Sequence, residues 1–162
     1  MAINGEEFKQ ALQNWASGIT IVTTQSDSFG LQGMTVSSFS SVSMEPPQVL
    51  VCINQSVSTG DGLKESGVFA INILSSEQQS TSNLFANPNK YEERFVNTPY
   101  TLGHNGAPLL TSSLASLECT VIEQIAVGTH WIIIGEIQDI HLNDGEPLLY
   151  YKAGYHLIQD HS

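Results

Sequence analysis

Apolar and polar positions change their spacing several times along this chain, and each change predicts a different element. Near the start, Asn4 is followed three residues later by Glu7, which is the arrangement of a helix capping box. Large apolar side chains then recur at helical spacing, at Phe8, Leu12 and Trp15. The pattern predicts an amphipathic helix that begins after Asn4 and ends at Gly18.

Runs of β-branched and alternating residues follow from Ile19 onward and predict strands. The runs ITIVTT and LQGMTV flank the turn cluster QSDSFG, which predicts a hairpin. Further strand-like runs occupy residues 48–54, 66–74, 115–125, 129–137, 146–152 and 155–158. Helices are expected over 75–86 and, in shorter form, within 87–100. Since no regular crossover helices separate the strands, we expect a mainly β fold, an antiparallel, Greek-key-like barrel with a few peripheral α-helices.

The composition is that of one folded domain over residues 1–162. Apolar residues make up 41% of the chain and charged residues 13%, which supplies a core and leaves little to solvate an open coil. The formal net charge of −11 opposes binding to nucleic acids and to anionic membranes, so neither is an expected partner. The opening run MAINGEEF has no signal-peptide character, and we expect a cytoplasmic protein.

The cysteines and histidines predict no metal site by their spacing. Cys52 and Cys119 lie 67 positions apart in apolar runs, and we expect both to be buried small hydrophobic residues without a disulfide. His130 begins the run HWIIIGE and has no second ligand at metal-binding spacing. It either takes part in proton or hydride chemistry or is a structural hydrogen-bonding residue.

Two hydroxyl-rich segments are candidate ligand walls. Residues 33–47 (GMTVSSFSSVSMEPP) do not alternate steadily, which is typical either of a kinked edge strand or of a wall of hydroxyl and amide donors for a phosphate or polyol chain. The segment CINQSVSTGDG leads into a helix predicted to begin near Ser58 or Thr59. Backbone N–H groups at such a start bind anions well, although an ordinary capped turn has the same residue types.

Two of the five basic residues, Lys90 and Arg94, share the loop NKYEERF. Their proximity indicates an anion site, or else Glu92 and Glu93 are their partners on a helix face. The phosphate-binding, serine-hydrolase and zinc-protease motifs GxGxxG, GxxxxGK[ST], GxSxG and HExxH are missing from the sequence. The remaining interpretation is a small acidic barrel that holds a cofactor and lets the cofactor react.

Successive blocks of the chain resemble the flavin reductase-like, FMN-binding split-barrel family, from about Phe8 to Leu157. The blocks are ASGITIVTT, GMTVSSFSSVSMEPPQVLVCIN with QSVST, EERF, GTHWIIIGE and PLLYYKAGYH. The family includes reductase components of two-component monooxygenases. The resemblance implies a split β-barrel homodimer that binds FMN, or FAD, and transfers a hydride from NADH or NADPH to the flavin. A separate oxygenase component would receive the reduced flavin.

The resemblance also assigns roles to individual positions. The flavin would lie along Gly33, Met34, Thr35, Val36, Ser37 and Ser38. Its ring would lie beside Cys52, Ile53 and Asn54, and its phosphate beside Ser58 and Thr59. The cation and aromatic pair of the family corresponds to Arg94 and Phe95, with Lys90 nearby, and would reach a phosphate.

His130 corresponds to the family histidine near the nicotinamide and is the expected catalytic residue, with Tyr155 near the same face. The family often has Asp before that histidine, and Thr129 stands there in this chain. The implied reaction is hydride transfer from nicotinamide C4 to flavin N5, for which the protein supplies stacking and alignment. The competing class is a non-catalytic storage or sensor protein that binds flavin or haem. Oxidation of a B6 vitamer phosphate would require additional basic residues.

Overall fold

The computed structural model describes residues 2–159. Its first helix begins directly after Asn4, where the capping pair predicts a helix start. The helices are α1 (Gly5–Leu12), α2 (Ser58–Ser66) and α3 (Gln79–Ala86), with the short 3₁₀ helices η1 (Ser76–Gln78) and η2 (Pro88–Glu93). The first strands are β1 (Ser17–Gly18), β2 (Thr20–Ser26), β3 (Gly30–Val36), β4 (Phe39–Met44), β5 (Pro47–Asn54) and β6 (Val68–Ile73). The later strands are β7 (Tyr100–Leu102), β8 (Pro108–Leu110), β9 (Ala115–Val127), β10 (His130–Leu142), β11 (Leu149–Tyr151) and β12 (Gly154–His156).

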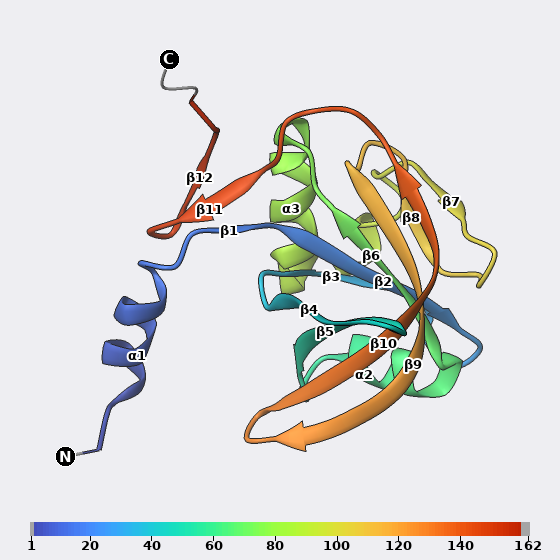
Figure 1. Cartoon of the computed structure of the whole chain (residues 1–162), viewed down its shortest axis with the longest axis horizontal. Coiled ribbons are helices and arrows are strands. Elements are labelled where there is room, and N and C mark those ends of the chain that lie inside the picture. The colour runs from blue at the N-terminus through green and yellow to red at the C-terminus, as the bar shows by residue number, and fades with distance from the viewer. Residues whose placement is uncertain (1, 160–162) are drawn as a thin grey trace.

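A seven-stranded antiparallel sheet forms the body of the molecule. Its strand order is β3-β2-β6-β9-β10-β5-β4 (Figure 1). Two smaller sheets, β1-β11-β12 and β7-β8, flank it. The predicted mainly β, antiparallel fold with few helices is therefore confirmed. The β7-β8 hairpin was not predicted, because its strands are only three residues long each.

The large sheet curls around one core. A single buried cluster takes Val22 from β2, Val36 from β3, Val51 from β5, Phe69 from β6 and Ile133 from β10. Strands near opposite ends of the sheet therefore enclose the same side chains, as in a barrel. The apolar composition predicted such a core, because there is enough buried aliphatic surface to hold a chain of this length.

Glycine is required where β10 passes the core. A Cβ atom at Gly135 would overlap the Phe69 ring, and the register of β10 against β9 shifts between Ile134 and Gly135. Phe69 is fully buried, so neither the ring nor the strand has room to move. The bulge bends the long β9-β10 hairpin across the core.

The first helix differs from the prediction at its C-terminal end. Asn4 accepts hydrogen bonds from the backbone N–H groups of Glu6 and Glu7, so the predicted capping box is confirmed. The helix ends at Leu12, not at Gly18. The Asn14 side-chain amide donates to the carbonyl of Gln10, which caps the last turn with a side chain that the apolar spacing does not reveal.

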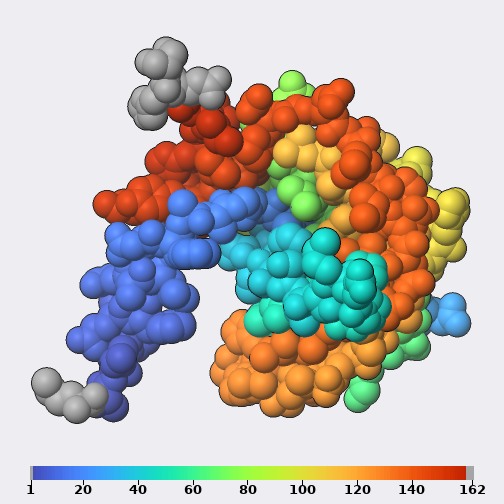
Figure 2. Space-filling view, viewed as in Figure 1, coloured from blue at the N-terminus to red at the C-terminus, as the bar shows by residue number. Residues whose placement is uncertain are grey.

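α1 stands away from the rest of the molecule (Figures 1 and 2). It contains no buried residue, and Trp15 just beyond it is 76% exposed. The other two helices lie against the sheet, with Leu63 of α2 and Phe85 of α3 buried. Among residues 2–159, no helix combines the length and apolar character needed to cross a membrane.

Candidate functional site

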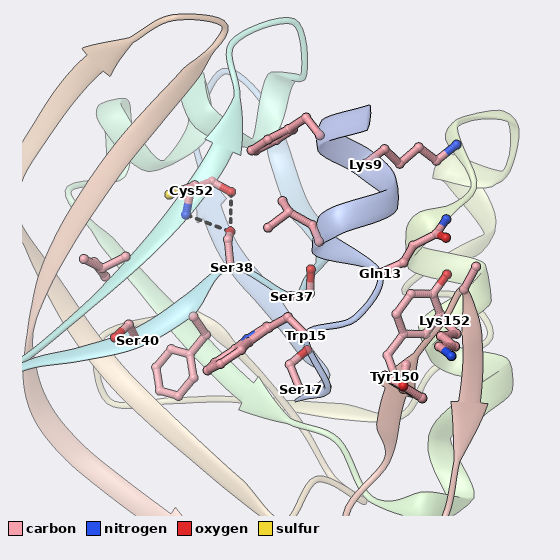
Figure 3. A pocket seen from close by; sticks show the side chains of 16 residues that line it. Lys9, Gln13, Trp15, Ser17, Ser37, Ser38, Ser40, Cys52, Tyr150 and Lys152 are labelled. Atoms are coloured by element: carbon pink, nitrogen blue, oxygen red, sulfur yellow. Dashed lines mark hydrogen bonds between the residues drawn. The ribbon is translucent and has the colours of Figure 1, made fainter. Parts of the chain in front are cut away.

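Three hollows adjoin along residues 34–38, where β3 ends and the chain crosses to β4. We name them by their nearest helix. The α1 hollow, of about 700 Å³, is lined by residues that include Phe8, Leu12, Trp15, Ser38 and Cys52 (Figure 3). The α2 hollow, of about 390 Å³, is lined by residues that include Met34, Val57, Ser58, Thr59, Tyr91 and Arg94. The α3 hollow, of about 350 Å³, is lined by residues that include Ser82, Asn83 and Tyr155.

Shared residues join the three hollows into one groove. Thr35 lines both the α2 and the α3 hollow, and Ser37 lines both the α3 and the α1 hollow. The α1 hollow is visible as the gap between the helix and the strands β4 and β5 (Figure 2). Met34, Thr35, Ser37 and Ser38 thus form a wall that an elongated ligand can follow. That a ligand binds along it stays a prediction.

Two hydroxyl groups of this wall, those of Thr35 and Ser38, are held by hydrogen bonds to the backbone. Thr35 Oγ1 donates to the carbonyl of Ser82 at 2.6 Å, and Ser38 Oγ bonds the backbone of Cys52 at 3.0 and 3.1 Å. Ser38 therefore ties the crossing segment to β5, as the dashed lines in Figure 3 show. The kinked-edge alternative also describes β4 correctly, since β4 is an edge strand whose register shifts between Ser41 and Ser43.

The start of α2 opens on the α2 hollow. Its N-cap residue is Val57, which offers no side-chain acceptor to the first N–H groups of the helix. Ser58 Oγ is turned away to Gln32 Oε1, to which it donates at 2.9 Å. A helix start without a cap carries partial positive charge and open donors, which favours an anion there.

Arg94 reaches the same hollow from the end of η2. The residue is 6% exposed, and its guanidinium donates to the carbonyls of Gly33 at 2.6 Å and Asn87 at 3.0 Å. Its Nε has no hydrogen-bond partner in the part of the chain that the structure describes, and burial lowers the pKa of the guanidinium from its ordinary value. Within residues 2–159 Arg94 forms no ion pair. A buried cation without a counter-charge fits a site that takes an anion.

The two cations of NKYEERF separate in the structure. Lys90 forms an exposed ion pair with Glu93 at 3.5 Å, which is the helix-face alternative, and it does not line the three hollows. Arg94 turns inward over Tyr91, with 5.0 Å between the guanidinium carbon and the ring centroid. The sequence could not separate them, because burial of one member depends on the position of β3.

Several predicted residues lie behind the wall instead of on it. Val36 and Ile53 are buried in the core, and Phe95 packs edge-on against Phe85 with 5.3 Å between centroids. A Cβ atom at Gly33 would lie 2.8 Å from Phe85, so glycine is required there by packing. Asn54 accepts from the backbone N–H of Ser56 at 2.9 Å and shapes the loop before α2.

His130 lies apart from the groove within one chain. It begins β10 opposite Asn54 of β5, and its exposed ring contacts the Thr129 hydroxyl at 2.9 Å. It is absent from the lining of the three hollows. The contact with Thr129 is compatible with the structural hydrogen-bonding alternative, and the predicted role of His130 at the nicotinamide stays a prediction.

Tyr155 does reach the groove. Its hydroxyl bonds Ser82 Oγ and Asn83 Oδ1, each at 2.9 Å, and it lines the α3 hollow. The apolar lining of the α1 hollow by Trp15 and Tyr150 was not predicted, because an amphipathic pattern does not show which distant segment lies opposite its apolar face. Tyr91 was missed as well, although its position three residues before Arg94 in the loop NKYEERF was a usable signal.

The two cysteines have different environments. Cys119 is fully buried, as expected, and burial together with the nearby Glu118 charge raises the pKa of its thiol to about 12. Cys52 is only half-buried and lines the α1 hollow, so the expectation of a buried residue is wrong there. The reason is that Cys52 alternates along β5 with the buried Val51 and Ile53, so its side chain lies on the face of the strand turned away from the core.

Comparison with known proteins assigns the chain to a family. The model of the flavin reductase like domain matches residues 12–159, and the chain belongs to that family. The family predicted from the sequence is therefore confirmed. The chain is 36% identical over 156 residues, 96% of its length, to the FMN reductase (NADH) RutF of Pseudomonas syringae pv. syringae (strain B728a), covering 87% of that protein.

Two further relatives extend the comparison. The reductase subunit HsaB of a flavin-dependent monooxygenase from Rhodococcus jostii (strain RHA1) is 32% identical over 155 residues, which cover 95% of this chain and 78% of HsaB. The NADH:FAD oxidoreductase SgcE6 of Streptomyces globisporus C-1027, solved in complex with NAD and FAD fragments, superposes with a TM-score of 0.89. It is 26% identical, and the match covers 98% of this chain and 97% of SgcE6.

Proposed function

We propose that the protein is an NAD(P)H-dependent flavin reductase that supplies reduced flavin to a partner monooxygenase. The observation that carries this proposal is the groove, in which a wall of fixed hydroxyls leads to an uncapped helix start beside a buried arginine. Those residues fit the polyol chain and the phosphate of a flavin. The activity agrees with that of the relatives RutF and HsaB.

The flavin phosphate is proposed to occupy the α2 hollow. There the N–H groups at Ser58 and Thr59 and the free Nε of Arg94 bind it, and Tyr91 shields it from water. The ribityl chain follows Thr35 and Ser37 along the α3 hollow. One Arg lines the α2 hollow, which favours FMN, with its single phosphate group, as the preferred flavin.

The ring is proposed to occupy the α1 hollow, beside Ser38 and Cys52. A bound flavin supplies the hydride acceptor, so the chain needs no nucleophile of its own. Phe8 and Leu12 of α1 give the hollow an apolar wall for the ring. The Ser38 bonds to Cys52 keep the wall rigid, which holds the ring in one orientation toward NADH or NADPH. His130 is proposed to position the nicotinamide.

A homodimer is proposed because α1 leaves apolar side chains uncovered. Phe8, Leu12 and Trp15 are all more than half exposed, although each lines the α1 hollow. A second copy that covers α1 would bury this surface and close the hollow. The exposed tip of the β9-β10 hairpin, with Val127 beside His130, offers a further apolar surface for the same contact. One domain over residues 1–162 and a cytoplasmic location complete the proposal.

The test is NADH consumption by the purified protein with and without added flavin. A reductase consumes NADH only when FMN, FAD or riboflavin is present, and FMN is expected to give the highest kcat/KM. A protein that binds FMN but leaves NADH and NADPH unconsumed under the same conditions is a storage or sensor protein, and the proposed activity is then wrong.

A further inference from the structure

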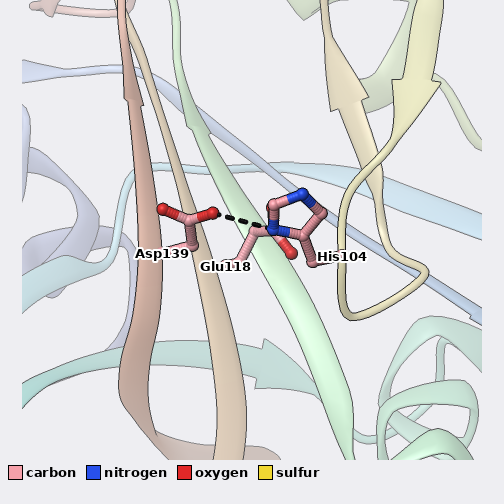
Figure 4. A group of neighbouring side chains, drawn as sticks. All are labelled: His104, Glu118 and Asp139. Carbon is pink, nitrogen blue, oxygen red and sulfur yellow. Dashed lines mark ion pairs between the residues drawn. The ribbon is translucent and has the colours of Figure 1, made fainter.

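Two histidines and two carboxylates meet on a side of the molecule that the groove does not use. His104 lies in the turn between β7 and β8, Glu118 on β9, and Asp139 and His141 on β10. Figure 4 shows three of them, with the His104 ring directed toward both carboxylates. None of the four residues lines the three hollows, so this cluster is independent of the proposed flavin site.

The separations between the donor atoms suit a small metal ion. His141 Nε2 lies 2.7 Å from Glu118 Oε1 and 3.7 Å from Asp139 Oδ2, and His104 Nδ1 lies 3.1 Å from Asp139 Oδ2. Donor atoms of His104, Glu118 and Asp139 all lie within 4.8 Å of one another. Tetrahedral zinc with bonds of about 2.0 to 2.1 Å separates its ligand atoms by roughly 3.3 to 3.4 Å. The observed distances fall on both sides of that value.

The least mobile ligand is built into the fold. Glu118 is 1% exposed, and its Oε2 accepts from the backbone N–H of Asn105 at 2.8 Å. Gly103 lies so close over this carboxylate that a Cβ atom there would be 2.6 Å from Oε2. A buried carboxylate is therefore fixed beneath the turn.

The other ligands can close on an ion without moving the sheet. His104 is 87% exposed in its side chain, and its ring centroid lies 6.4 Å from that of His141. Rotation about the His104 side-chain bonds brings its Nδ1 nearer the other donors at little cost, since no packing holds the ring. The hydrogen bonds that now join the imidazoles to the carboxylates are the contacts that a cation would replace.

We propose that His104, Glu118, Asp139 and His141 form a binding site for one divalent transition-metal ion, with Zn²⁺ as the fitting ion. Two imidazoles beside two carboxylates match zinc, whereas Mg²⁺ and Ca²⁺ prefer oxygen ligands throughout. The bound ion ties the turn between β7 and β8 to β9 and β10. Its role is to stabilise this side of the barrel. The local spacing of the sequence could not indicate the site, because its ligands come from three segments.

The test is equilibrium dialysis of the full chain, without a histidine tag, against Zn²⁺, with thermal unfolding measured in parallel with and without chelator. The wild-type protein is expected to bind one Zn²⁺ per chain and to show a higher Tm with the ion. Co²⁺ in place of Zn²⁺ is expected to give the intense visible absorption of tetrahedral cobalt. These measurements do not involve flavin or NADH, so they fail or succeed separately from the proposed reductase activity.

Matched variants locate the ion. His104→Ala removes an exposed ligand on which the packing of the fold does not depend. Asp139→Asn removes the negative charge of a second ligand and keeps the shape of its side chain. Each is expected to weaken Zn²⁺ binding by at least about tenfold, since loss of even an indirect partner of a metal ligand costs 10-fold to 100-fold. The control is His156→Ala, because His156 lies on β12 and its ring contacts only Tyr151, through the carbonyl and the edge of the ring, in the interactions found among described residues. Zinc binding that is absent in the wild type, equal in His104→Ala, or lost in His156→Ala overturns the proposal.

Discussion

The helices α1 and α2 are built in opposite ways, and the difference separates folding from function. α1 has a complete capping box at Asn4 and Glu7, yet none of its residues is buried. α2 has no side-chain cap at Val57, yet Thr59, Gly62 and Leu63 are buried. α1 is therefore stabilised locally and leaves its apolar face for another surface. α2 is stabilised by packing, and its open start is left for a ligand.

Leucine truncation on each helix gives the largest contrast. Leu63→Ala in α2 is expected to lower the free energy of unfolding by about 2 to 5 kcal/mol, because Leu63 is fully buried in the core. Leu12→Ala in α1 is expected to cost less than about 0.5 kcal/mol in the monomer. Denaturant unfolding at low protein concentration measures both. If the two variants lost similar amounts of unfolding free energy, α1 would contribute to the stability of the core as α2 does, and the contrast between the helices would be wrong.

The arginine beside α2 gives the next largest effect. Arg94→Ala is expected to weaken FMN binding by about 1.5 to 3 kcal/mol relative to riboflavin, the scale of a hydrogen bond to a charged group. Lys90→Ala is the matched control, because Lys90 is exposed and paired with Glu93. Fluorescence titration with each flavin gives the ratio of the Kd values for FMN and riboflavin. Loss of folded protein affects both titrations equally, so it does not change this ratio. If Arg94→Ala leaves the ratio of Kd values unchanged, the proposal that the flavin phosphate binds in the α2 hollow is wrong.

The third prediction concerns His130, which a hydrogen bond joins to the loop before α2. The side-chain amide of Gln55 donates to the carbonyl of His130, which joins this loop to the start of β10. His130→Ala is expected to lower kcat/KM for NADH by about tenfold, the smaller end of the range for a misaligned donor, because Thr129 supplies no carboxylate to orient the ring. FMN affinity and Tm are expected to stay near wild type. A drop in Tm that accounts for the lost activity would assign His130 a structural role only.

Changes to the N-caps of the two helices give the smallest expected effects: one variant removes the cap of α1, and the other adds a cap to α2. Asn4→Ala is expected to destabilise α1 by about 1 kcal/mol, seen as faster amide exchange over residues 5–12 with an unchanged global Tm.

Val57→Thr supplies α2 with the cap that it lacks. It is expected to weaken FMN binding, because the new hydroxyl competes with the phosphate for the same N–H groups. Tighter FMN binding in Val57→Thr would contradict an open helix start as the phosphate site.

Local patterns predicted much of this molecule. The capping box at Asn4, the β2-β3 hairpin and the start of α2 near Ser58 depend on residues close in sequence, and each is confirmed. The groove wall along residues 34–38 was predicted from hydroxyl content and family resemblance. What failed was anything set by distant segments. Examples are the burial of Arg94 against β3 and the cluster around Glu118. Cys52 is different, because the alternation along β5 is local and places it on the face opposite the buried Val51 and Ile53.

A crystal structure of the protein with FMN tests the central claim most directly, namely that the open start of α2 receives the flavin phosphate. The expected complex has phosphate oxygens within hydrogen-bond distance of the N–H groups of Ser58 and Thr59 and of Arg94 Nε. Its polyol chain follows residues 35–37, and its ring lies beside Cys52. A complex in which the phosphate lies elsewhere, with Arg94 Nε still unpartnered and the first turn of α2 bonded only to water, would contradict the claim.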